Sequence, residues 1–221
     1  MKVSLILACA GKGERAGFDK NKLLVDFNGE TCLSRVFSVF EKSGLIDEFI
    51  ITASERDIPE ITALFGEKAK MVLGGATRTE SVKNGLSAVT GDIVLIHDGA
   101  RPFVTERIIK DCTKSAEKFG SGITAIRSKD TVLKNEECPE YLGKNDIYIV
   151  QTPQAFNTKE IKTAYEKAGE KNTYNDDGEV YAKFIRPIKL VEGDHRNVKL
   201  TFKEDFDLLG SPLYRFGTGF D

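Results

Sequence analysis

The chain has 221 residues, with 32 Lys and Arg against 34 Asp and Glu, so its formal net charge is −2. This length predicts a single domain over residues 1–221, large enough to bury a core without disulfides or a structural metal. Proteins that coat duplex nucleic acid carry a clear positive excess, so the charge sum argues against that class, and it equally argues against an acidic disordered tail.

Cysteine spacing and hydropathy argue against further classes of protein. Cys9, Cys32, Cys112 and Cys138 lie far apart in the sequence, so neither a zinc site nor a disulfide framework is expected. No run reaches the roughly 18 apolar residues of a membrane span, and the apolar start leads into glycines without a signal-peptide cleavage pattern. The sequence predicts a cytoplasmic protein that binds neither nucleic acid nor a membrane.

Short apolar runs alternate with amphipathic stretches along the chain. The runs at 3–9, 48–53, 70–73, 93–96 and 122–126 are apolar on both faces, as in a parallel sheet covered by helices on both sides. Between them lie three stretches whose apolar residues would share one face of a helix. These residues are Leu33, Val36, Phe37 and Phe40; Val82, Leu86 and Val89; and Ile108, Ile109, Cys112 and Ala116. The alternation predicts a doubly wound, mostly parallel α/β fold.

The later part of the chain departs from this alternation. Residues 130–134 and 147–150 have strand patterns around a polar turn, typical of a β-hairpin inserted into the sheet. The segment 128–150 is either a surface loop or an arm that pairs with a second subunit. Beyond it we expect a helix at 158–168, a strand at 188–191 and a short helix at 204–209, with 210–221 unassigned.

A glycine-rich loop follows the first predicted strand. Gly11 and Gly13 let the backbone approach a ligand, and successive N–H groups there can hold phosphate oxygens. Gly11, Gly13 and Ala16 also fit the degenerate dinucleotide fingerprint, but a basic loop at 19–22 stands where that fold needs a continuing helix. A tight turn that binds nothing is the third interpretation.

Further loops carry polar groups beyond predicted strands. Gly74, Gly75, Arg78 and Ser81 suit a base or sugar, although Thr77 and Glu80 equally predict a capped helix start.

A carboxylate just past the carboxyl end of a parallel strand is well placed for Mg²⁺. Asp98 has this position, and Arg101 beside it suits a phosphate. The alternatives are a turn-forming aspartate and a solvated arginine. Lys199 and Thr201 share one face of an extended stretch, which by itself is a charged surface strand.

Taken together and in order, these segments resemble one family, the 2-C-methyl-D-erythritol 4-phosphate cytidylyltransferases of the non-mevalonate isoprenoid pathway. The matching motifs lie at 10–15, 22, 74–81, 97–103, 151–156, 176–177 and 191–201. The resemblance implies a Rossmann-like nucleotidyltransferase fold and transfer of CMP from CTP to methylerythritol phosphate with release of pyrophosphate. It also implies Mg²⁺ or another divalent cation, and a homodimer in which one subunit's arm reaches the partner's site.

The resemblance assigns roles to individual residues. The catalytic cations would be Arg15, Lys22 and Lys199. The nucleotide would be held by Ala10, Gly11, Gly13, Gly74, Gly75, Arg78, Ser81, Asp98 and Gly99. The sugar phosphate would be held by Arg101, Thr131, Lys144, Asp176 and Thr201. Asp98 would also lie at the metal.

The composition agrees with this chemistry. A phosphate monoester has its second pKa near 6, so at pH 7 it is already a nucleophile and needs no general base. The reaction needs two anions brought into line and cations that offset the charge growing at phosphorus. A chain with 2 histidines and no evident nucleophile–base pair can therefore be an enzyme of this kind.

Four positions depart from the family's pattern, and at one of them Cys9 enlarges a position where the family has a small residue. Asn21 stands where proline usually precedes Lys22, which predicts a less rigid loop, Lys144 replaces an arginine, and Asn175 replaces a threonine. The nearest alternative is a ribitol 5-phosphate cytidylyltransferase of teichoic acid synthesis, which the paired aspartates at 176–177 argue against. A NAD-binding oxidoreductase and a nucleotide-binding module without catalysis are the more distant alternatives.

Overall fold

A computed structural model describes residues 1–11, 17–18, 20–27, 29–135, 137–169 and 174–210. Its centre is a seven-stranded sheet in the order β11-β7-β10-β6-β1-β4-β5. The strands are β1 (Val3–Ala8), β4 (Glu48–Ala53), β5 (Lys70–Leu73), β6 (Ile93–Asp98), β7 (Ser121–Arg127), β10 (Tyr148–Asn157) and β11 (Leu190–Glu192). Neighbours pair in parallel except at β10, which is antiparallel to both β6 and β7. The predicted α/β class is confirmed, and β1, β4 and β5 lie where the apolar runs place them.

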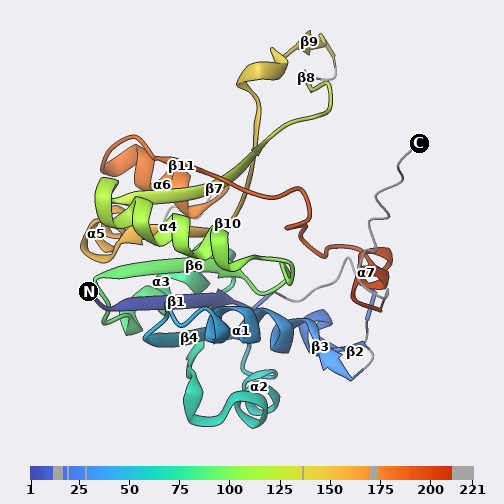
Figure 1. Cartoon of the computed structure of the whole chain (residues 1–221), viewed down its shortest axis with the longest axis vertical. Helices are drawn as coiled ribbons and strands as arrows, with labels where there is room; N and C mark the ends of the chain where they lie inside the picture. The colour runs from blue at the N-terminus through green and yellow to red at the C-terminus, as the bar shows by residue number, and fades with distance from the viewer. Residues whose placement is uncertain (12–16, 19, 28, 136, 170–173, 211–221) are drawn as a thin grey trace.

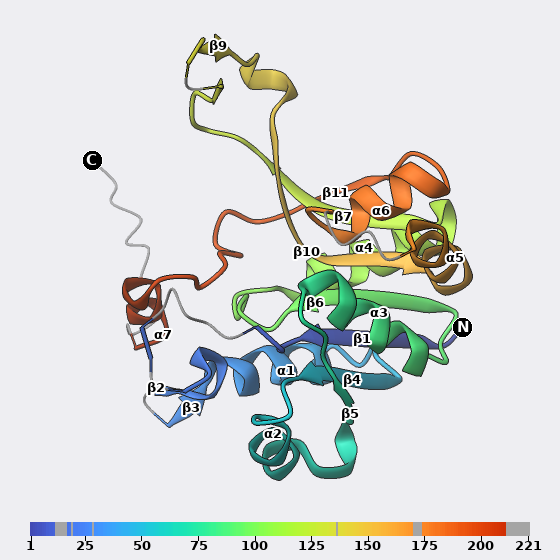
Figure 2. The same ribbon diagram turned by 180° about the vertical axis from the view of Figure 1, so that it is seen from behind.

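Helices cover both faces of this sheet (Figure 1), because its central strands are apolar on both sides. Leu5 and Leu7 of β1 face a core formed with α1 (Cys32–Lys42), α2 (Ile58–Phe65) and α4 (Glu106–Phe119). Ile6 faces the opposite core, formed with α3 (Arg78–Ala88), α5 (Thr158–Ala168) and α6 (Asp177–Phe184). Figure 2 shows this second set of helices from behind. The predicted helix at 158–168 is confirmed at both ends.

The segment between β7 and β10 projects from the sheet as an arm (Figure 1). It carries β8 (Leu133–Lys134), β9 (Glu140–Tyr141) and the 3-10 turn η4 (Lys144–Asp146). The predicted pairing within it is wrong, because β8 pairs with β9 and not with residues 147–150. Those residues belong to the base of the arm and to β10, whose first part pairs with β7 through Tyr148 and Arg127.

The remaining elements are short. They are the 3-10 turns η2 (Lys22–Leu24), η3 (Gly66–Lys68) and η5 (Lys203–Phe206), the strands β2 (Asp26–Phe27) and β3 (Glu30–Thr31), and the helix α7 (Asp207–Gly210). The structure therefore divides the predicted 204–209 helix into η5 and α7. It also adds α2 and α6, which the sequence patterns did not predict. Within the part of the chain that is described, no helix is long and apolar enough to cross a membrane.

Candidate active site

A cleft of about 980 Å³ lies at the carboxyl edge of the parallel strands. Ligands bind at this edge in open α/β sheets, since the loops that leave neighbouring parallel strands converge there. The cleft collects predicted site residues from segments far apart in sequence: Ala10, Gly11, Lys22, Gly74, Gly75, Arg78, Ser81, Asp98 and Lys199. Gly13 and Arg15 of the prediction lie outside the described residues.

The Gly74–Gly75 turn is fixed by the start of α3. Thr77 caps the helix by accepting a hydrogen bond from Glu80 N, as the sequence predicts. Ser81 Oγ accepts from Gly75 N at 3.0 Å and donates to Thr77 O at 2.9 Å. A Cβ on Gly74 would collide with the Cβ of Ala10, so glycine lets this turn pack against the first loop. The capped helix start and the cleft wall are thus the same structure.

Asp98, at the end of β6, is the centre of a cluster of cations. Its carboxylate lies 2.8 Å from Lys199 Nζ, 3.1 Å from Arg78 Nε and 3.8 Å from Arg101 Nε. Burial by itself would raise the pKa of Asp98, but Arg78, Lys199 and Arg101 outweigh it and hold the pKa well below its usual range. The carboxylate therefore stays ionised and keeps these cations together at one wall of the cleft.

Arg78 is held from its other side by Asp177, a residue whose role the sequence analysis missed. Arg78 Nη2 lies 2.8 Å from Asp177 Oδ2, and Asp177 is 0% exposed. Tyr165 donates a hydrogen bond to Asp177 Oδ1 at 2.5 Å. Burial would lower the pKa of Arg78, but Asp177 and Asp98 outweigh it and raise that pKa. The second aspartate of the 176–177 pair was the only sequence signal for this contact.

Lys22, in η2, also lines the cleft. Its Nζ donates to Leu200 O at 2.7 Å, which ties the basic loop to the segment that carries Lys199. Asn21, which stands where the family's proline is expected, is buried, and its amide braces the loop. Asn21 Nδ2 donates to Asp57 at 2.9 Å and to Cys9 O at 3.3 Å, while Oδ1 accepts from Leu23 N.

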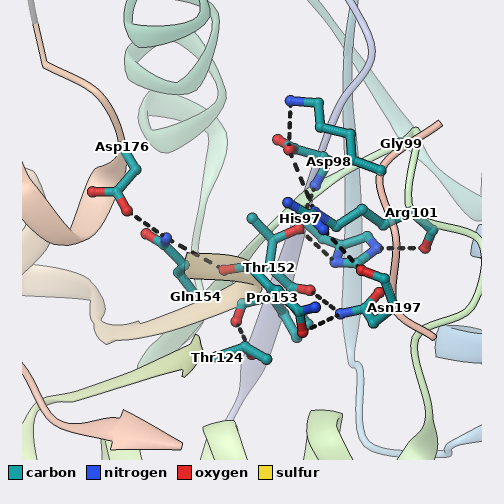
Figure 3. Close-up of polar contacts among 12 residues, drawn as sticks. His97, Asp98, Gly99, Arg101, Thr124, Thr152, Pro153, Gln154, Asp176 and Asn197 are labelled. Carbon is teal, nitrogen blue, oxygen red and sulfur yellow. Dashed lines mark hydrogen bonds and ion pairs between the residues drawn. The ribbon is translucent and has the colours of Figure 1, made fainter. Parts of the chain in front are cut away.

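Arg101 lies beside this cluster and is shown with its neighbours in Figure 3. Its Nη1 donates to Asn197 O at 2.8 Å. Its Nε is buried and has no hydrogen-bond partner among the residues that the structure describes. Burial lowers the pKa of Arg101, although an arginine remains protonated at neutral pH. This Nε lies 3.8 Å from the Asp98 carboxylate, so Arg101 adds its positive charge to the cluster.

The other predicted substrate residues are not gathered at the cleft. Thr131 and Lys144 are in the arm, and the side chain of Lys144 lies outside what is described. Asp176 caps α6 through Glu179 N and accepts from Gln154 Nε2 at 3.0 Å. Thr201 Oγ1 donates to Lys199 O at 3.1 Å. Gly99 is required by packing, since a Cβ there would lie 2.6 Å from Cys9 Sγ.

The donor set fits a magnesium ion that the substrate helps to hold. Asp98 offers one carboxylate at the cleft, whose pKa its cationic neighbours hold below the usual range. In the described ranges no three His, Cys, Asp or Glu side chains come together as a metal site. Mg²⁺ commonly uses one or two carboxylates and completes its coordination with phosphate oxygens and water. Asp98 would therefore hold the ion together with a bound triphosphate.

Comparisons with known proteins show the family of this chain. The family model described as 2-C-methyl-D-erythritol 4-phosphate cytidylyltransferase matches residues 3–211. The chain is 36% identical over 214 residues to the enzyme of that name from Halalkalibacterium halodurans, covering 93% of this chain and 94% of the relative.

Solved structures agree in fold. The 4-diphosphocytidyl-2C-methyl-D-erythritol synthase from Anaerococcus prevotii superposes with a TM-score of 0.82 at 29% identity, covering 95% of this chain and 96% of that one. The bifunctional IspDF from Campylobacter jejuni gives a TM-score of 0.83 at 26% identity, covering 94% of this chain and 54% of that one. The chain belongs to the 2-C-methyl-D-erythritol 4-phosphate cytidylyltransferase family and is a nucleotidyltransferase.

Proposed function

We propose that this cleft transfers CMP from CTP to the phosphate of 2-C-methyl-D-erythritol 4-phosphate and releases pyrophosphate. The observation that carries the proposal is the family match over residues 3–211. The cluster around Asp98 supports it, because the reaction needs cations where two anions meet. The relatives from H. halodurans and A. prevotii both carry the methylerythritol name, which favours that acceptor over ribitol phosphate.

The proposed step needs positioning and charge, without a general base. An oxygen of the acceptor phosphate bonds to the α-phosphorus of CTP while the bond to the α,β-bridging oxygen breaks, and pyrophosphate leaves with that electron pair. His97 is 0% exposed, and burial lowers its pKa to about 4, so it is not available to the cleft as a base. The nucleophile is already ionised at pH 7.

The cleft residues have matching roles in this proposal. Ala10 and Gly11 offer backbone to the triphosphate, which Lys22 and Lys199 neutralise, and Gly13 and Arg15 belong to the same loop. The wall of Gly74, Gly75, Arg78 and Ser81 holds the cytidine, next to Asp98 and Gly99. Arg101 contributes its positive charge to the site of the acceptor phosphate, beside Lys199 and Thr201.

The acceptor is tested by incubating the protein with CTP and one polyol phosphate at a time, and following pyrophosphate release. We expect turnover with methylerythritol phosphate and at most a trace with ribitol 5-phosphate. Turnover confined to ribitol 5-phosphate would replace the proposed acceptor. An NADH fluorescence titration with a saturable change would instead favour a dinucleotide enzyme.

Removing divalent cations is expected to abolish the reaction. A divalent ion supplies charge neutralisation at the triphosphate, and Asp98 is the carboxylate placed to hold it. Excess EDTA should lower pyrophosphate release to background, and Mg²⁺ added beyond the chelator should restore it. Undiminished turnover after EDTA and gel filtration would remove the metal from the proposal.

We also propose that the arm completes the site of a second subunit in a homodimer. The arm exposes apolar side chains, with Leu133 48% and Tyr141 75% exposed, and Ile149 at its base is 46% exposed. Apolar groups in this number on a projecting segment are typical of a surface that a partner covers. Thr131 and Lys144 would then reach the acceptor in the partner's cleft.

Subunit complementation tests the arm. Lys199→Ala disables a cleft, and Lys144→Ala disables an arm. Co-expression of the two variants should restore activity to about a quarter of the unaltered level, since only mixed dimers have one complete site. Purified mixtures that stay as inactive as each variant alone would show that the arm does not act across subunits.

A further inference from the structure

His97 and Thr152 are buried next to the cleft and are hydrogen-bonded to each other (Figure 3). We call this pair of side chains the relay. His97 precedes Asp98 on β6 and is 0% exposed, while Thr152 lies on the neighbouring strand β10 and is 5% exposed. Neither side chain lines the cleft. Both nevertheless form hydrogen bonds with the backbone of site residues, Thr152 with Asp98 and His97 with Arg101.

The hydrogen bonds of the relay allow one arrangement of protons. His97 Nε2 lies 3.1 Å from Arg101 O, and a carbonyl oxygen can only accept, so Nε2 carries the proton. The partners of the ring are a carbonyl and a hydroxyl, both uncharged, and a buried ring in this setting is neutral. His97 Nδ1 therefore accepts from the Thr152 hydroxyl at 3.1 Å.

The same hydroxyl reaches Asp98. Asp98 N donates to Thr152 Oγ1 at 3.0 Å, so the sequence of donors runs from Asp98 N–H through Thr152 to His97 and on to Arg101 O. Arg101 N also donates to Asp98 O at 3.1 Å and closes the turn between them. Both ends of the turn are thus tied to β10 by a single threonine.

A second connection leads from Thr152 to the Arg101 side chain. Asn197 Nδ2 donates to Thr152 O at 2.8 Å, and Asn197 O accepts from Arg101 Nη1 at 2.8 Å. Thr152 is therefore connected to the Asp98 backbone, the Arg101 backbone and, through Asn197, the Arg101 guanidinium.

We propose that His97 and Thr152 are positioning residues that set the distance between Asp98 and Arg101, and so between the nucleotide and the acceptor phosphate. The inference rests on the proposed function, in which Asp98 serves the nucleotide side and Arg101 the acceptor. A relay of this kind changes the kinetic constants of two bound substrates, whereas a purely structural contact changes stability alone.

The test compares two threonines of neighbouring strands. Thr152→Val removes the hydroxyl of the relay. Thr124→Val is the matched control, because Thr124 is also buried and donates to Pro153 O at 2.6 Å but, among the described residues, makes no hydrogen bond to Asp98 or Arg101. We expect Thr152→Val to lower kcat/KM at least tenfold, Thr152→Ser to restore it to within about threefold, and Thr124→Val to leave it within about twofold.

Substitution of His97 separates the two ends of the relay. His97→Asn can keep the acceptor for Thr152 and loses the contact with Arg101 O, so the KM for the acceptor should rise more than the KM for CTP. His97→Gln can keep the donor to Arg101 O and loses Thr152, so kcat should fall with the acceptor KM nearly unchanged. Equal kinetic effects of Thr152→Val and Thr124→Val at matched stability would overturn the proposal.

A second measurement needs neither enzymatic activity nor a variant, so it remains informative if the variants do not fold. In the ¹⁵N-labelled unaltered protein at pH 7.5, the shifts of His97 should report a neutral ring protonated at Nε2. An Nδ1-protonated ring would overturn the relay. If the unaltered protein releases no pyrophosphate with CTP and methylerythritol phosphate, the proposed function fails while the ring shifts still report the relay.

Discussion

Replacing Lys199 with alanine is expected to lower kcat for CMP transfer by about a hundredfold or more. Lys199 lies 2.8 Å from Asp98 and 40% of its side chain is exposed, so its ammonium group can reach a ligand in the cleft. Loss of one preorganised cation that meets developing charge costs on the order of 3 kcal/mol in the barrier. Steady-state pyrophosphate release at saturating CTP and acceptor measures the effect.

Two variants control this result. Lys199→Arg keeps the charge and should recover part of the lost rate, because the planar guanidinium cannot reproduce the ammonium's position. Lys68→Ala removes a lysine that pairs with Glu41 on the surface, 65% exposed, and should leave kcat unchanged. A Lys199→Ala enzyme that retains more than half of the unaltered rate would show that this cleft is not the reacting site.

Arg78→Met is expected to destabilise the fold by about 3–5 kcal/mol as well as to weaken nucleotide binding. The substitution leaves Asp177, which is 0% exposed, without its guanidinium partner, and removal of one member of a buried pair has a cost of this size. Asp98 loses one of its cations at the same time. Urea unfolding followed by circular dichroism gives the free energy of unfolding.

The double variant Arg78→Met with Asp177→Asn separates stability from function. Replacing the unpaired Asp177 carboxylate with a neutral amide should recover about 2 kcal/mol of the lost free energy of unfolding, since the penalty comes mainly from that buried charge. Affinity for CTP should not recover, because the guanidinium at the cleft is still absent. Additive destabilisation in the double variant would contradict the pairing of Arg78 with Asp177.

Apolar periodicity predicted the central strands and the longer helices because their burial is continuous. Residues 48–53 and 70–73 were placed correctly, and so was α5, whose start is marked by the capping side chain of Asn157. The helix α6 was missed because Asp177 and Gly178 begin it, and both residues favour turns in a sequence. The arm was predicted, but its two-residue strands are too short for periodicity to fix their pairing.

The sequence patterns singled out Asp98 and Arg78, which follow predicted strands, whereas Lys199 was assigned only through the family resemblance. The sheet topology brings the three side chains together. Asp177 was not assigned to Arg78, because the two are 99 positions apart and no local pattern links them. The contact of Asn21 was not foreseen for the same reason: its partner Asp57 lies on a distant loop.

The antiparallel placement of β10 beside β7 has a consequence for how the arm can vary. Because these strands are adjacent, the arm is in effect a long hairpin connection, and the sheet brings its two ends together. Loop-closure entropy grows slowly with length, so doubling such a connection costs only about 0.6 kcal/mol. Insertions and deletions in the arm therefore cost the fold little, so the length of the arm is constrained by what it contacts and not by the stability of the sheet.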